Sequence, residues 1–212
     1  VEFPLSDADA GTLGGRVPSL AGKRVTVLIW TTTPWTIPAN LGIAFHPDFD
    51  YGAFEFEDRV VILAEGLAAQ VSEATGRTFG RQLASFKGRQ LDRVTFRHPF
   101  YERDSLGVLG EYVTLDQGTG AVHTAPGHGA DDFATGVRYG LDIYAPIGRD
   151  GRFTADTGVV GGLKVFEANP VVEAALAERV PENSVLSHDL LEGTFARAGL
   201  VTDIEVIEEF PS

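Results

Sequence analysis

The segment that decides the fold is RVTVLIWTTTPWTIPAN, residues 24–40. Its first part, residues 24–30, is a run of β-branched and apolar side chains that is typical of a buried strand. Pro34 and Pro38 follow, and proline fits neither a helix interior nor a regular central strand. We therefore expect a buried strand that leads into an ordered loop.

Hydroxyl and amide side chains follow the end of this strand. They belong to Thr31, Thr32, Thr33, Thr36 and Asn40. Because proline restricts the backbone here, these groups can be held in place. They suit a site that hydrogen-bonds ribose hydroxyls, a carbonyl or a water without a fixed charge. The alternative is a strand end where threonine serves β-propensity and turn bonding.

The rest of the chain reads as short strands with few helices. Strands are expected at 42–45, 51–56 and 59–63, and further short runs, including 108–115, lie between residues 81 and 124. Helices are expected at 65–75 and 129–139, each closed by a glycine, and a third starts at Asn169 and Pro170. This pattern predicts a mixed α/β fold, a closed or nearly closed β-barrel decorated by short helices.

A second segment, GTGAVHTAPGHGADD (118–132), brings glycines, histidines and carboxylates together. His123 lies between small residues, which leave room around its imidazole. Asp131 and Asp132 fall at an expected helix start, where capping and the helix dipole already favour a carboxylate. Helix capping needs only one of these two carboxylates, so the other is a candidate for binding an ammonium group. The alternatives are a structural His123 and a metal site from His123, His128 and Asp132, whose spacing matches no metal motif.

Composition narrows the functional classes. The chain has 212 residues, begins at Val1 and contains neither Cys nor Met, from which we expect a segment of a longer polypeptide. Without cysteine, a disulfide scaffold, a thiolate zinc site and a cysteine nucleophile are excluded. No run approaches the roughly 18 apolar residues of a membrane span, and the polar, acidic start is unlike a signal peptide. The net charge of −13 disfavours a general nucleic-acid binder, because it repels phosphate backbones.

Taken together, the two segments resemble one known family. WTTTPWTIPAN (30–40), followed about eighty residues later by GTGAVHTAPGHGADDF (118–133), is similar to the editing domain inserted into isoleucyl-tRNA synthetase, called connective polypeptide 1. The similarity includes HPDFDY (46–51), HPF (98–100) and GLKVFEAN (162–169). The resemblance implies an editing domain at 1–180 and a tail at 181–212 that does not match the family.

The resemblance implies an ester hydrolase. The reaction is post-transfer editing, in which an oriented water hydrolyses mischarged Val-tRNA(Ile). A hydrophobic pocket distinguishes one methylene only weakly, and this synthetase is itself the standard example of that limit, so a second pocket restores accuracy. No metal or other cofactor is implied, and ATP belongs to the catalytic body. Neither a HIGH-like nor a KMSKS-like motif occurs here, so no synthetase activity is expected.

The resemblance also implies partners and residue roles. The partners are the 3′-terminal aminoacyl-adenosine of tRNA(Ile) and the parent synthetase body, for a cytoplasmic monomer that binds no membrane. Catalytic roles fall on Thr31, Thr32, Thr33, His123 and Asp132, where His123 shapes the amino-acid pocket and Asp132 binds the α-ammonium group. Substrate-binding roles fall on Trp35, Thr36, Asn40, His128 and Asp131. The alternatives are a non-catalytic module that binds the aminoacyl-adenosine end, and a metal-dependent hydrolase.

Overall fold

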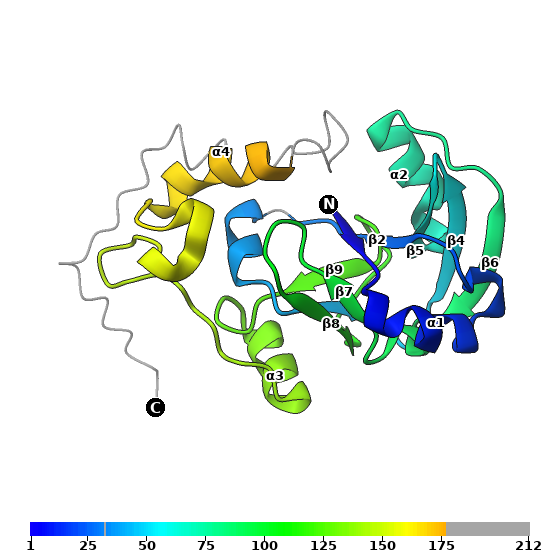
Figure 1. Cartoon of the computed structure of the whole chain (residues 1–212), viewed down its shortest axis with the longest axis horizontal. Helices are drawn as coiled ribbons and strands as arrows, with labels where there is room; N and C mark the ends of the chain where they lie inside the picture. Colours follow the sequence, from blue (N-terminus) through cyan, green and yellow to red (C-terminus); the bar gives the residue numbers. More distant parts are fainter. Residues whose placement is uncertain (32, 177–212) are drawn as a thin grey trace, which may run out of the picture.

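The strands form two mixed sheets (Figure 1) in a computed structural model that describes residues 1–31 and 33–176. The first sheet has the order β1-β2-β5-β4-β6, and the second has the order β7-β8-β3-β9. β2 pairs with β5, and β3 with β8, in parallel, while the other pairs are antiparallel. The strands are β1 Glu2–Pro4, β2 Val25–Leu28, β3 Gly42–Phe45, β4 Asp50–Phe56, β5 Arg59–Ala64, β6 Gln82–Lys87, β7 Thr95–Arg97, β8 Asp104–Leu109 and β9 Ala121–Thr124.

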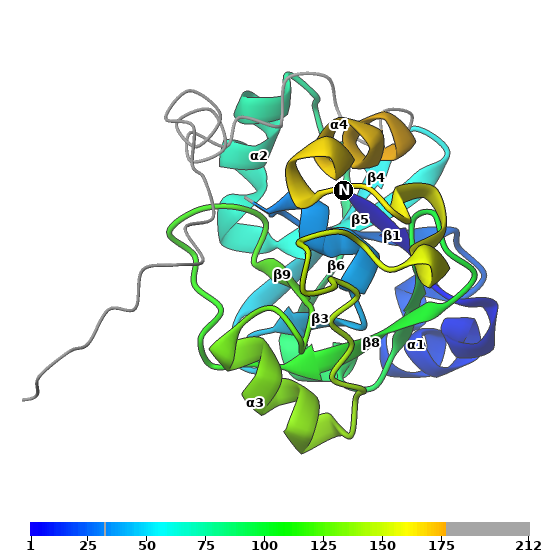
Figure 2. The same cartoon turned by 90° about the vertical axis from the view of Figure 1, so that its left-hand side faces the viewer.

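The helices lie around these sheets, with α4 on one side and α3 on the opposite side in both views (Figures 1 and 2). The α-helices are α1 Ala10–Arg16, α2 Ala68–Thr75, α3 Ala130–Tyr139 and α4 Val165–Leu176. Short 3₁₀ helices are η1 Asp7–Asp9, η2 Pro18–Leu20, η3 Pro34–Ala39, η4 Glu65–Leu67, η5 Gly88–Leu91 and η6 Ala155–Val160. The predicted helices at 65–75 and 129–139 are confirmed, and both end at left-handed glycines, Gly76 and Gly140.

The mixed α/β class is confirmed, but the expected barrel is wrong for the described residues, whose strand pairings give two open sheets. The sheets meet at two isolated bridges, Leu5 to Phe96 and Trp30 to Val122. Strand β1 ends at Pro4, and Leu5 N beyond it still donates to Val25 O at 2.9 Å. The backbone turns into η3 soon after Trp30, so β2 does not extend along β9. The two isolated bridges do not extend into ladders, so the pairings leave two sheets, with β6 at an open edge of the first.

Two further elements differ from expectation. The proline-containing loop is the 3₁₀ helix η3, because Thr36 N donates to Thr33 O and Asn40 N to Ile37 O, and neither bond needs an N–H from proline. Helix α4 starts before Asn169 because the Glu167 carboxylate accepts a hydrogen bond from Lys164 N at 2.9 Å and caps the first turn. Pro170 consequently lies inside this helix. Strand β1 and helix α1 were not predicted from the sequence.

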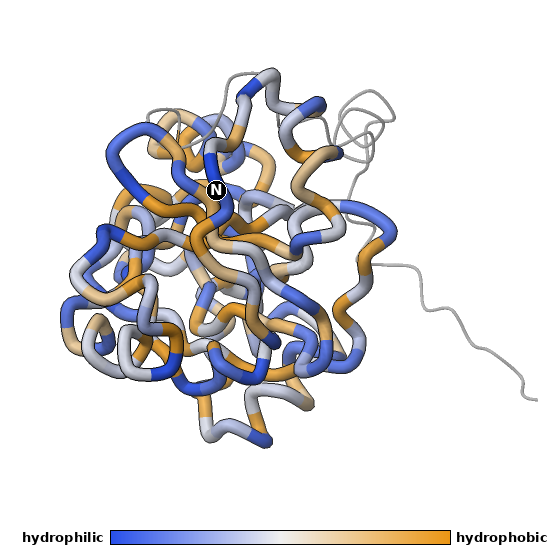
Figure 3. The backbone as a smooth tube through the Cα atoms, turned by 90° about the vertical axis from the view of Figure 1, so that its right-hand side faces the viewer, coloured by the Kyte–Doolittle hydropathy of each residue, from blue (hydrophilic) through white to orange (hydrophobic). Residues whose placement is uncertain are grey.

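One hydrophobic core joins the two sheets. Its largest fully buried side chains include Phe3, Phe45, Tyr51 and Phe96, and Figure 3 shows apolar segments running through the interior. The hydroxyl of Tyr51, on β4, donates to Gly120 O at 2.5 Å and accepts from His46 N at 3.0 Å. Because β9 begins directly after Gly120, this contact fixes the position of β9 against the first sheet.

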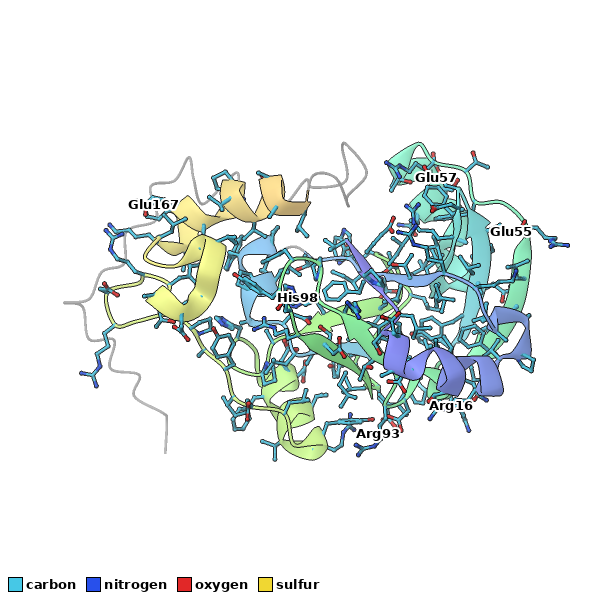
Figure 4. All side chains as sticks on the ribbon, in the orientation of Figure 1. Arg16, Glu55, Glu57, Arg93, His98 and Glu167 are labelled. Carbon is cyan, nitrogen blue, oxygen red and sulfur yellow. The ribbon has the colours of Figure 1, made fainter. Side chains whose placement is uncertain are left out.

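Charged residues cover the periphery. Figure 4 shows Glu55 and Glu57 at one end of the molecule and Glu167 at the other, with His98 between them in the interior. Along the edge strand β6 and its approach, Lys87 pairs with Asp50 at 2.8 Å and Arg81 with Glu55 at 3.2 Å. In the described part of the chain, none of the helices has the length and apolar character needed to cross a bilayer.

The contact at Gly120 generates a stability prediction. Gly120 and Gly140 have nearly equal φ values, +70° and +71°, but a Cβ at Gly120 would lie 2.4 Å from Ala64 Cβ, whereas none would meet an atom within 4 Å at Gly140. Both alanine variants carry the left-handed strain of roughly 1–2 kcal/mol. We expect Gly120→Ala to lose about 1–3 kcal/mol more than Gly140→Ala, because it also overpacks the core.

Urea unfolding of the two variants beside the wild type measures this difference. Because the φ strain is matched, the gap between the two variants reports the steric contact alone. Equal losses in the two variants would show that β9 is not held tightly against β5.

Candidate functional site

The two segments singled out in the sequence meet at one pocket of about 530 Å³. The first contributes Thr31, Thr33 and Thr36, which we call the threonine strip. The second contributes His123 on β9, His128 in the following loop and Asp132 in the first turn of α3. Aromatic and polar side chains complete the wall, among them Trp30, Trp35, Tyr112, Thr114 and Gln117. The pocket thus combines hydroxyls with one carboxylate.

Not every predicted site residue lines this pocket. Thr32 lies outside the described residues. Asn40 is fully buried behind His123, and Asp131 is exposed on α3, so neither is part of the described lining. The sequence analysis missed Trp30, Tyr112, Thr114 and Gln117. Trp30 could have been found by its position next to the strip, but residues 108–115 were expected to be a strand, whereas β8 ends at Leu109 and the chain beyond it forms pocket wall.

A larger cavity of about 930 Å³ lies against β1, β2 and residues 97–104. Its lining includes five arginines: Arg24, Arg59, Arg77, Arg97 and Arg103. Four of these arginines already face carboxylates, as in the pair between Arg59 and Glu2 at 2.7 Å. We place the chemistry in the smaller pocket because its hydroxyls and the Asp132 carboxylate face a shared space.

The threonine strip is an ordered row of hydroxyls. Thr33 N donates to Thr31 Oγ1 at 3.1 Å, and the Thr31 and Thr33 hydroxyl oxygens lie 3.3 Å apart. The Thr33 and Thr36 hydroxyl oxygens lie 3.1 Å apart, and the Thr36 hydroxyl donates to Thr33 O at 2.7 Å. The first turn of η3 therefore holds these side chains together, as the two prolines suggested.

His123 is buried and uncharged at neutral pH. Its Nε2 lies 2.7 Å from Thr36 Oγ1, and its Nδ1 lies 3.0 Å from Asn40 Nδ2. Burial, and to a smaller extent the nearby charge of a protonated His128, lower the pKa of His123 from 6.5 to about 4. With both ring nitrogens hydrogen-bonded to protein groups, this imidazole is poorly placed to act as a general base.

Asp132 supplies the carboxylate of the pocket. Its Oδ2 accepts a hydrogen bond from Ala125 N at 2.8 Å, and within the described residues its Oδ1 accepts none. Burial raises the pKa of Asp132, the hydrogen bond from Ala125 opposes that rise, and the charge of Asp131 adds to it. A half-buried carboxylate with a free oxygen suits an ammonium group, because a charge-assisted hydrogen bond offsets its desolvation.

The arrangement does not fit a metal centre. The part of the chain that the structure describes contains no group of three or more His, Asp or Glu side chains arranged to hold a metal ion. Both nitrogens of His123 and one oxygen of Asp132 are engaged by protein groups. His128 Nε2 is buried and has no hydrogen-bond partner, but within the described residues it belongs to no group of three candidate ligands. The geometry gives the metal-dependent alternative no support.

Known proteins with similar sequences are isoleucine–tRNA ligases. The ligase of Geobacter sulfurreducens is 51% identical over 178 residues, and that of Syntrophotalea carbinolica is 46% identical over 178 residues. Each alignment covers 84% of this chain but 19% of the relative, so the chain spans about a fifth of the length of these proteins. No family model matches the chain.

Known structures with a similar fold are parts of leucyl-tRNA synthetases. The structure of GlLeuRS-CP1 superposes with a TM-score of 0.64 at 18% identity, covering 84% of this chain and 94% of that one. The editing domain of the P. knowlesi cytosolic leucyl-tRNA synthetase gives 0.62 at 11% identity, covering 84% and 92%. At such low identity these likenesses show the fold, which is that of the synthetase editing domains.

The burial of His123 predicts a pH-dependent stability. The unfolded chain takes up a proton on this residue near pH 6.5, but the folded chain does so only near pH 4. The unfolded state therefore binds more protons between these values, and the free energy of unfolding falls as the pH falls through this window. The pKa difference corresponds to about 3 kcal/mol at most. We expect His123→Gln to flatten this slope.

Thermal unfolding between pH 7 and pH 4.5 measures the slope. His46→Gln is the control, because His46 stacks on Phe49 away from the pocket, and it should retain the wild-type slope. A wild-type slope in His123→Gln would mean that the imidazole does not stay neutral in the fold.

Proposed function

Because the chain belongs to the isoleucine–tRNA ligase family and corresponds to its editing-domain region, we propose that it is an aminoacyl-tRNA deacylase. Its proposed reaction is hydrolysis of the ester that joins valine to the 3′-terminal adenosine of tRNA(Ile). The observation that carries the proposal is the shared pocket of the threonine strip and Asp132. An aminoacyl ester carries an ammonium group next to its reacting carbonyl, and this pocket offers partners for both.

In this proposal Asp132 binds the α-ammonium group through its free oxygen. The bond orients the amino acid and places the ester carbonyl toward the threonine strip. The hydroxyls of Thr31 and Thr33 then hydrogen-bond the attacking water and the terminal ribose. Much of the acceleration comes from the positioning of the water and the ester relative to each other. His123 contributes shape and a neutral surface to the amino-acid pocket.

The proposal extends to the organisation of the protein. Residues 1–180 form the editing domain, and the tail at 181–212, which lies outside the described residues, receives no function. The partners are the aminoacyl-adenosine end of tRNA(Ile) and a parent synthetase body that binds ATP and performs aminoacylation. We place the protein in the cytoplasm, as a monomer that needs no cofactor for editing.

Replacement of Asp132 tests the anchor. Asp132→Asn keeps the shape and the acceptor for Ala125 N but removes the charge that binds the ammonium group. We expect kcat/KM for deacylation of Val-tRNA(Ile) to fall about 10- to 100-fold, the value of a hydrogen bond between charged groups. The measurement is release of labelled valine, with Ile-tRNA(Ile) as the substrate that should be spared.

Asp131→Asn is the matched control, because Asp131 is the adjacent carboxylate on the same helix but lies outside the pocket. It should stay within about twofold of the wild type, as expected for an exposed side chain without a contact. Equal losses in the two variants would assign the effect to the charge of the helix start. Absence of valine release by the wild type above the spontaneous rate would contradict the deacylase itself.

The net charge of −13 favours one second candidate, a module that binds the aminoacyl-adenosine end without turning it over. Such a surface repels tRNA, so the 212-residue chain is expected to bind a non-hydrolysable valyl-adenosine analogue more tightly than free tRNA(Ile). Calorimetric titration of both ligands measures the order. Tighter binding of uncharged tRNA, with a steep dependence on salt, would show that this chain grips the tRNA by its backbone.

A further inference from the structure

Ser105, on β8, is a buried polar residue that has no role so far. Its side chain is fully buried, and Ser105 is not one of the residues that line the pocket. Its hydroxyl donates to Asn40 Oδ1 at 2.5 Å. A buried hydroxyl with a single partner can be structural, so its meaning depends on what Asn40 does.

Asn40 is held in one orientation from both ends of its amide. Its Nδ2 lies 2.8 Å from Gly42 O, and a carbonyl oxygen can only accept, so the amide nitrogen must face it. The amide oxygen then faces the Ser105 hydroxyl. A rotated amide would place oxygen against the Gly42 carbonyl and nitrogen against Ser105.

This orientation fixes the proton on His123. The second N–H of Asn40 points to His123 Nδ1 at 3.0 Å, and an amide nitrogen cannot accept a hydrogen bond. Nδ1 is therefore unprotonated, and a neutral imidazole must carry its proton on Nε2. That N–H donates to Thr36 Oγ1 at 2.7 Å.

The same order of donors and acceptors continues from His123 through the threonine strip. The Thr36 hydroxyl donates its proton to Thr33 O at 2.7 Å, so its oxygen accepts from His123 and from the Thr33 hydroxyl at 3.1 Å. The Thr33 proton is thereby directed away from the pocket. Lone pairs of Thr33 and Thr31 remain for a donor in the pocket.

We infer that Ser105 is a positioning residue: through Asn40 it holds His123 in the Nε2-protonated form and makes the threonine strip a row of hydrogen-bond acceptors. Such a row accepts the O–H groups of a water or a ribose and leaves their oxygen lone pairs directed elsewhere. A water held in this way presents a lone pair to the ester carbonyl. The link to hydrolysis rests on the proposed function, whereas the state of His123 does not.

The test measures the protonated ring nitrogen directly. Nitrogen-15 NMR of the histidine side chains at pH 7 distinguishes the two neutral forms, and His123→Gln assigns the signal. We expect the wild type to show Nε2–H alone. In Ser105→Ala the amide loses one of its two orienting partners, so we expect the Nδ1–H form to appear beside it. A wild type that carries the proton on Nδ1 overturns the inference without any variant.

Ser6→Ala is the matched control. Ser6 is also a buried serine with a 2.5 Å hydrogen bond, to Thr95 Oγ1, and it lies away from the pocket. It should lose stability to a similar degree and leave the His123 signal unchanged. If Ser105→Ala does not fold, Ser105→Cys replaces it, because a thiol keeps the volume but donates weakly.

Deacylation kinetics complete the experiment. We expect Ser105→Ala to lower kcat for Val-tRNA(Ile) roughly 10-fold with KM almost unchanged, as for a misplaced reacting group. An unchanged His123 signal together with wild-type kcat would exclude a positioning role for Ser105. A shifted signal with wild-type kcat would disprove the link to hydrolysis. A shifted signal in a protein whose wild type has no deacylase activity would leave the positioning role intact and refute the proposed function instead.

Discussion

A buried imidazole that must stay uncharged is the constraint on which the site depends. His123 lies in the interior of the second sheet, where a charge would be costly. Its two nitrogens are hydrogen-bonded to Thr36 and Asn40, at the beginning and the end of η3. The His123 side chain thus connects β9 to the proline-containing segment and positions the threonines of that segment. The polar character of this side of the pocket follows from the same two hydrogen bonds.

The groups of this pocket are suited to binding and orienting a substrate and a water. Asp132, the carboxylate in the described lining, accepts a hydrogen bond from Ala125 N, and both nitrogens of His123 are hydrogen-bonded to protein groups. His128 Nε2 is the ring nitrogen of the described lining that has no hydrogen-bond partner. The hydroxyls of the threonine strip hold a water or a ribose but do not remove a proton at neutral pH. Such a site suits an ester, which is already activated toward water and needs an aligned attack more than a strong base.

Much of the fold could be predicted because the strands that carry it are marked by local pattern. Strands β3, β4 and β5 were predicted from short runs almost at their observed bounds, and glycines marked the ends of α2 and α3. The rest depends on contacts that have no local signal. Glu167 moves the start of α4 by capping Lys164, and single bridges replace the expected closure of the sheets.

As with the fold, part of the candidate site could be predicted from the sequence. The threonines, His123 and Asp132 stood out by type and spacing, and most of them meet in the pocket. Asn40 was singled out, but its place behind the imidazole could not be read from a sequence, and Ser105 is a single serine in an apolar strand. Residues that act through another residue carry no motif, because what selects them is a geometry that only the folded chain defines.

The two open sheets have a consequence for handling the protein at high concentration. Free strand edges can pair with other chains, and this is a common route to aggregates. Here the short strands β1 and β7 lie next to each other, joined by the Leu5–Phe96 bridge and by the hydrogen bond from Ser6 N to Thr95 O. The longer edge at β6 carries Lys87 paired with Asp50, and an incoming strand would have to desolvate that charge. The charged pair at β6 in this way disfavours pairing of that edge with other copies of the chain.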